Sequence, residues 1–125
     1  MTRAASAPNL RVTSRGAMID ARTGQVLNAN PPRVLVDVYW NGTVPSVNAS
    51  FGLSGIVDDG AGTITLVFQP GFTTTNYVAS AMACGVGNTY AHILVKDAAS
   101  CQVEVCNENG TAVDPSGLMF MAFGD

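Results

Sequence analysis

Short segments of alternating apolar and polar residues, separated by turn residues, occupy most of the chain after Pro31 and Pro32. In segments 47–53 and 63–68, apolar side chains alternate with small or polar ones, the period-two pattern of a strand with one buried face. Asn41-Gly42 is a typical hairpin turn. Further strands are expected at 34–40, 77–84, 90–95, 101–106 and 118–123.

Seven or eight short strands at a spacing of about ten residues indicate a sandwich or barrel. We therefore expect an all-β fold, an antiparallel β-sandwich (jelly-roll-like) over residues 34–125, with an extended N-terminal arm. No amphipathic helix is predicted. From the alternation, the expected core comprises Val36, Val38, Phe51, Ile64, Leu66, Phe68, Val78 and Leu94.

The first 33 residues differ from the rest, being rich in Ala, Ser, Asn and Arg with weak periodicity. Within them, two short apolar stretches flank Arg22-Thr23-Gly24, which suits a small hairpin or turn over 18–27. The two consecutive prolines then hold the backbone extended. The expected domain organisation is an extended arm over 1–33 and a β-sandwich knob over 34–125.

Charge is strongly segregated between these two parts. The arm carries five arginines and one aspartate, net +4, whereas residues 34–125 carry one lysine and eight acids, net −7. A basic arm on an acidic body can bind an acidic protein surface or a neighbouring subunit. No aromatic residue interleaves the arginines to stack bases, so nucleic acid is not expected as a partner. The candidate docking residues are Arg3, Arg11, Arg15, Arg22 and Arg33.

The low charge content indicates self-association. Charged residues make up 12% of the chain, against about 25% in typical soluble domains. A largely neutral surface is prone to self-adhesion, and a permanent interface would hide part of it. We therefore expect a homo-oligomer.

Membrane insertion and a disulfide framework are not expected. No apolar run approaches the roughly 18 residues of a membrane-spanning helix, and the N-terminus lacks the apolar core of a secretory signal. The cysteines Cys84, Cys101 and Cys106 are odd in number, which argues against a disulfide framework. We expect free cysteines that pack as small apolar residues.

The sequence contains no recognisable catalytic constellation. His92 is the only histidine, and a zinc site or a catalytic triad would need partners from elsewhere in the fold. Asp58-Asp59-Gly60 lacks the alternating oxygen ligands of a calcium loop and is interpreted as part of a hairpin turn. The chain is therefore not expected to be an enzyme or to hold a metal or cofactor.

Several motifs occur in a defined order between residues 36 and 78. Trp40-Asn41-Gly42-Thr43 precedes Ala49-Ser50-Phe51, and 54–62 reads Ser-Gly-Ile-Val-Asp-Asp-Gly-Ala-Gly before the strand that ends at Phe68. Asn76-Tyr77-Val78 follows, and Phe120-Met121-Ala122-Phe123-Gly124 closes the chain. In this order the segment over about 34–125 resembles a β-domain found near the C-terminal ends of bacteriophage tail-fibre and tail-associated proteins.

The resemblance implies a virion structural role, an antiparallel β fold, assembly as a homotrimer and no catalysis. Because only a short arm precedes the knob instead of a long shaft, a small fibre-like, head-fibre or capsid-decoration protein is expected, docked to other virion proteins through its arm. The alternative is a receptor-binding fibre tip that recognises a host-surface glycan or protein. In both cases the protein would be made in the cytoplasm of a bacterial host and located in the virion.

Overall fold

A computed structural model describes residues 10–12, 18–20, 22–23, 26–28, 32–85 and 87–124. The chain divides into two compact units, residues 1–31 and 32–125. No helix long and apolar enough to span a membrane occurs among these described residues.

The N-terminal unit contains three strands of three residues each, β1 (Leu10–Val12), β2 (Met18–Asp20) and β3 (Val26–Asn28). They form one sheet in the order β1-β2-β3, and both pairings are antiparallel. The pairing of β2 with β3 confirms the hairpin expected over 18–27. This segment, predicted as an extended arm, therefore has a small sheet of its own.

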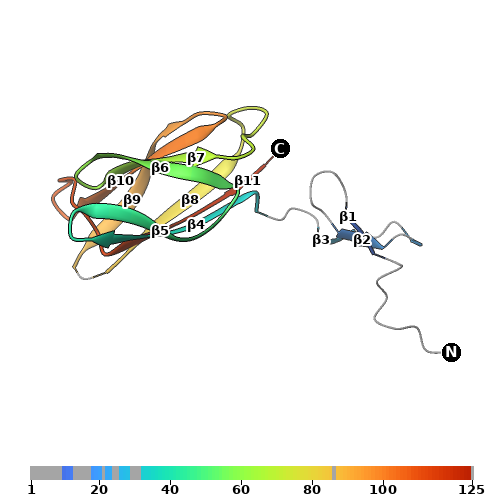
Figure 1. Ribbon diagram of the computed structural model, residues 1–125, viewed down its shortest axis with the longest axis horizontal. Helices are drawn as coiled ribbons and strands as arrows, with labels where there is room; N and C mark the ends of the chain where they lie inside the picture. The colour runs from blue at the N-terminus through green and yellow to red at the C-terminus, as the bar shows by residue number, and fades with distance from the viewer. Residues whose placement is uncertain are drawn as a thin grey trace. The chain divides into compact units, whose positions relative to one another are not determined.

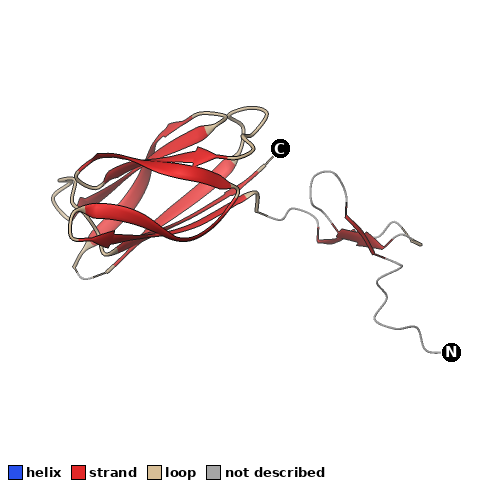
Figure 2. Ribbon diagram, in the orientation of Figure 1, coloured by secondary structure: helices blue, strands red, loops and turns tan. Residues whose placement is uncertain are grey.

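The second unit is an antiparallel β-sandwich, which confirms the expected fold class (Figures 1 and 2). One four-stranded sheet has the order β5-β4-β11-β8, and we call it the first sheet; the second sheet has the order β6-β7-β10-β9. The strands are β4 (Val34–Asn41), β5 (Val44–Phe51), β6 (Leu53–Gly60), β7 (Thr63–Phe68), β8 (Val78–Cys84), β9 (Thr89–Lys96), β10 (Ser100–Asn107) and β11 (Gly117–Phe123).

The chain passes between the sheets at a glycine that no other residue can replace without strain. β5 belongs to the first sheet and β6 to the second, and only Gly52 separates them. Gly52 has φ +76°, and a Cβ built there would overlap the carbonyl oxygen of Arg33. Glycine adopts this left-handed conformation without a steric penalty, so Gly52 permits the tight transition from one layer to the other.

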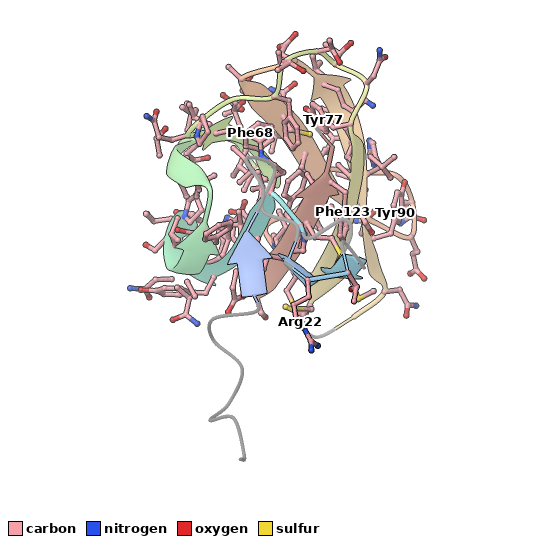
Figure 3. The ribbon with its side chains drawn as sticks, turned by 90° about the vertical axis from the view of Figure 1, so that its right-hand side faces the viewer. Arg22, Phe68, Tyr77, Tyr90 and Phe123 are labelled. Carbon is pink, nitrogen blue, oxygen red and sulfur yellow. The ribbon has the colours of Figure 1, made fainter. Side chains whose placement is uncertain are left out.

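The core lies between the sheets and is supplied mainly by the four inner strands. On β4 and β7 every second side chain is buried, the pattern of strands with one face toward the core. At one end of the sandwich, Phe68 contacts Phe72, Tyr77 and Phe120 at ring-centroid distances of 5.4, 5.8 and 6.0 Å; Figure 3 labels Phe68 and Tyr77. The hydroxyl of Tyr77 lies 2.8 Å from the carbonyl oxygen of Asp97, its hydrogen-bond acceptor.

Five of the eight predicted core residues are confirmed as buried: Val36, Val38, Ile64, Leu66 and Phe68. The prediction for Phe51 was wrong, because this side chain is 62% exposed. A β-bulge explains the difference: the register between β4 and β5 shifts after the pair Val38–Val47, and Phe51 ends opposite Leu35, which faces outward. A bulge adds one residue and inverts the alternation beyond it.

The predictions for Val78 and Leu94 were also wrong, since both side chains are exposed. On β8 the inward positions belong to alanines, which are partly buried against the core; Val78 therefore falls on the opposite face. On β9 the register with β10 shifts between Val95 and Ile93. This bulge leaves Leu94 without a partner on β10 and turns it outward.

The strand β6 was not predicted. Its residues 58–60 had been interpreted as part of a turn, but Asp58 and Gly60 pair with β7, and the turn comprises Ala61 and Gly62. Asp58 still supports the chain reversal, because one of its carboxylate oxygens accepts a hydrogen bond from the amide of Gly60 at 3.2 Å.

Candidate interaction surface

The outer face of the first sheet is apolar and open. Its exposed large side chains come from all four strands, and we call this set the apolar face: Leu35, Tyr39, Val44, Phe51, Val78, Met82, Met119 and Met121. Phe51, Val78 and Met82 each expose more than 60% of their surface. Period-two alternation produces the set, because the neighbours of these residues along each strand face the core.

The strand register arranges these side chains in rows across the sheet. Phe51 lies opposite Leu35, which in turn lies opposite Met121. In the next row Met119 lies between Asp37 and Met82. A shallow groove of about 530 Å³ crosses the four strands along these rows, and Phe51, Met82, Met119 and Met121 are among its lining residues. Flexible methionines adapt to an opposing surface better than branched side chains do.

The polar groups on this face are few, and one of them already has a hydrogen-bond partner. Asp37 is the one charged side chain among the residues that line the groove, and its carboxylate accepts a hydrogen bond of 2.9 Å from the side-chain amide of Asn48. The other polar lining residues are the neutral Ser50 and Ser80. Contiguous apolar surface of this kind marks interaction sites on soluble domains.

The outer face of the second sheet has a different chemistry. Asp59 accepts hydrogen bonds from the hydroxyl of Thr65 at 2.5 Å and from the side-chain amide of Gln102 at 3.1 Å. Thr63 donates to Glu104 at 3.4 Å. Exposed apolar residues are present here too, but they lie on the edge strands β6 and β9: Val57, Tyr90, Leu94 and Val95. A polar, hydrogen-bonded centre of this kind is suited to contact with water.

His92 has partners that the sequence did not reveal. It lies opposite Glu104 on β10, and its Nε2 is 3.3 Å from a carboxylate oxygen of Glu104. The thiol of Cys106 donates to the same oxygen at 3.3 Å. Burial, followed by the hydrogen bond and charge of Glu104, raises the pKa of the Cys106 thiol. Cys106 in turn raises the pKa of the neighbouring Tyr90 phenol. The strand pairing that makes this cluster is a long-range feature that local sequence pattern does not give.

All three cysteines are free, as expected. Cys101 points into the core, where burial raises the pKa of its thiol to about 11. Cys106 is on the opposite side of β10 but is also buried, and the bridge between Cys106 and Ala112 brings a loop across it. Cys84 is exposed at the end of β8.

The candidate docking arginines fall into three groups. The side chains of Arg3, Arg11 and Arg15 lie outside the described residues, whereas Arg22 is described and exposed. Arg33 belongs to the sandwich unit: its guanidinium lies 5.2 Å from the ring centroid of Phe72 and donates to the carbonyl oxygen of Gly71 at 3.5 Å. Arg33 is therefore already engaged within the sandwich unit.

The comparisons of this chain with protein-family models, with curated proteins and with solved structures found no match.

Proposed function

We propose that the protein is a non-enzymatic structural subunit that associates with copies of itself through the apolar face. The observation that supports this most strongly is the exposure of eight large apolar side chains on the outer face of one sheet. The low charge content of the chain, 12%, agrees with a surface that is partly covered. A second copy is the occupant because it presents an equally neutral, equally apolar surface.

We further propose a homotrimer mounted on a bacteriophage virion, as a small fibre-like or capsid-decoration protein. The trimeric state and the location on the virion are proposed from the resemblance of residues 34–125 to phage fibre β-domains. A three-fold axis requires two different patches to meet. The apolar face offers these at its opposite edges, Phe51 on β5 and Val78 and Met82 on β8. In the trimer the β5 edge of one subunit packs against the β8 edge of the next.

Substituting lysine at each edge tests the interface. Phe51→Lys and Met82→Lys place an unpaired charge in the contact, which costs several kcal/mol, so association should weaken by at least about 100-fold. Both side chains are more than 60% exposed in the protomer, so folding should be retained. Val57→Lys is the matched control, because it makes the same change at an exposed valine of the second sheet.

Sedimentation equilibrium should give three times the 12.9 kDa chain mass for the wild type and the control, and one chain mass for the two edge variants. A wild type that sediments as a monomer would refute the proposal.

Attachment to the virion is tested separately, by substitutions in the N-terminal arm. Replacing Arg3, Arg11, Arg15 and Arg22 by alanine should release the protein from phage particles while the trimer persists, because several weak exposed pairs together hold the attachment. Arg33 is left intact because it packs on Phe72. Cryo-electron microscopy of particles that carry wild-type or variant protein gives the readout. Variant protein that still occupies the particle would assign docking to the sandwich. Particle-free trimers that bind host cells would instead favour the receptor-binding alternative.

A further inference from the structure

We propose that His92, Glu104 and Cys106 form a binding site for a zinc-class divalent cation on the outer face of the second sheet. One donor atom from each residue lies within 4.8 Å of the other two. The strands supply this geometry directly: Glu104 and Cys106 are two positions apart on β10 and so face the same side, and His92 is the cross-strand partner of Glu104 on β9.

The carboxylate is held with one oxygen toward the site. Oε1 of Glu104 lies 3.3 Å from Nε2 of His92 and 3.3 Å from the sulfur of Cys106. The hydroxyl of Thr63 donates to the other oxygen, Oε2, at 3.4 Å. In metal sites, a hydrogen bond to the carboxylate oxygen that does not bind the metal, such as this one from Thr63, orients the ligand carboxylate. Oε1 is therefore the common point of the three donors.

The imidazole is also directed by its surroundings. Nδ1 of His92 is shielded from solvent by neighbouring atoms, so Nε2, next to Glu104, is the nitrogen available to a ligand. The His92 side chain is 39% exposed and that of Glu104 is 26% exposed, whereas Cys106 is 1% exposed. A cation can thus enter from solvent past the histidine and the carboxylate and reach the sulfur of Cys106 beneath them, which releases its proton when the metal binds.

The donor set selects the class of cation. Thiolate and imidazole ligands favour zinc and related transition metals, whereas magnesium and calcium prefer sites made of oxygen alone. Three protein ligands leave one tetrahedral position for water or for a group from another molecule. Because β9 is an edge strand that pairs only with β10 among the described strands, a cation shared by His92 and β10 would fasten that edge to the sheet.

Cobalt(II) titration of the metal-stripped full-length protein tests the site, because cobalt replaces zinc and a cobalt–thiolate bond gives a charge-transfer band in the near ultraviolet. One equivalent of cobalt should produce this band. Adding zinc should displace the cobalt and remove the band. Cys106→Ala should abolish the band, whereas Cys84→Ala, which removes an exposed cysteine outside the cluster, should leave it unchanged. His92→Ala should weaken cobalt binding by about 100-fold, as expected for loss of a direct ligand.

Circular dichroism melting of each metal-free variant checks that the sandwich has folded. His92 is partly exposed, so His92→Ala remains a clean test even if Cys106→Ala impairs folding. Zinc should raise the melting temperature of the wild type and of Cys84→Ala but not of His92→Ala. The inference is refuted if the wild type gives no thiolate band, or if His92→Ala binds cobalt as tightly as the wild type does. A monomeric or unmounted protein would leave this result unaffected, since all three ligands come from one subunit.

Discussion

The two sheets of the sandwich share one core but have opposite outer faces. On the first sheet, Phe51, Leu35 and Met121 form a row of apolar side chains that are exposed. On the second sheet, Asp59 joins Thr65 and Gln102 in a hydrogen-bonded group at the centre. The shared core explains why the inward residues of both sheets are apolar, but it does not explain the outward residues. We propose that the difference between the outer faces reflects what each face contacts, a second copy of the chain on one side and water on the other.

The largest expected effect separates a core aromatic from an aromatic of the apolar face. Phe68 is 3% exposed and packs on three other rings, so Phe68→Ala should lower the free energy of unfolding by about 3–5 kcal/mol. Phe51→Ala should lower that of the monomer by less than about 1 kcal/mol, because its ring is already exposed. Urea denaturation at a concentration below that of assembly measures both. A similar loss for the two variants would mean that Phe51 belongs to the core of the protomer.

A smaller effect is expected on the outer face of the second sheet. Asp59→Ala removes the acceptor of two hydrogen bonds, from Thr65 and Gln102. Because the group is exposed, water replaces the lost partners, and the free energy of unfolding should fall by about 1 kcal/mol. Sedimentation should show an unchanged oligomer. If Asp59→Ala dissociates the oligomer, the second sheet also takes part in the interface.

The smallest perturbation is chemical labelling of the cysteines, which needs no substitution beyond the one that keeps the protein monomeric. At pH 8 a thiol reagent should modify Cys84 in the folded monomeric Phe51→Lys variant, because Cys84 is exposed. Cys101 should stay unmodified: burial raises the pKa of its thiol to about 11, so the reactive thiolate is scarce until the pH approaches that value. Peptide mass spectrometry after labelling identifies the modified residue. Rapid modification of Cys101 at pH 8 would show that the sandwich opens readily.

The sequence predicted the architecture because turn residues separate short strands and because the inner strands β4 and β7 alternate without interruption. Val36 and Val38 on β4 show how a regular period predicts burial correctly. The errors occur where the register shifts. The bulge on β5 turns Phe51 outward and the bulge on β9 turns Leu94 outward, and a bulge leaves no mark in the hydrophobic period of a single strand. These errors hid the apolar face, since Phe51 and Val78 had been assigned to the core.

The His92 cluster was missed for a related reason. His92 lies more than ten residues before Glu104 and Cys106 along the chain and meets them only through the pairing of β9 with β10. The low charge content led to the expectation that some surface is covered, which stays a prediction, and composition does not say which surface. Only the strand register distinguishes one face from the other.

Two tyrosines allow the most direct test of the claim that the apolar face is the covered one. Tyr39 on the apolar face is 46% exposed in the protomer, and Tyr90 on the second sheet is 47% exposed; Figure 3 labels Tyr90 on that sheet. Tyrosine iodination of the assembled wild type, read by peptide mass spectrometry, is compared at each site with the monomeric Phe51→Lys variant. This comparison cancels the effect of the raised pKa of Tyr90.

Assembly through the apolar face should slow the labelling of Tyr39 by at least about tenfold, because a covered face excludes water, and should leave Tyr90 within about twofold. Equal labelling rates of Tyr39 in the assembled and monomeric proteins, or protection of Tyr90 in its place, would contradict the account.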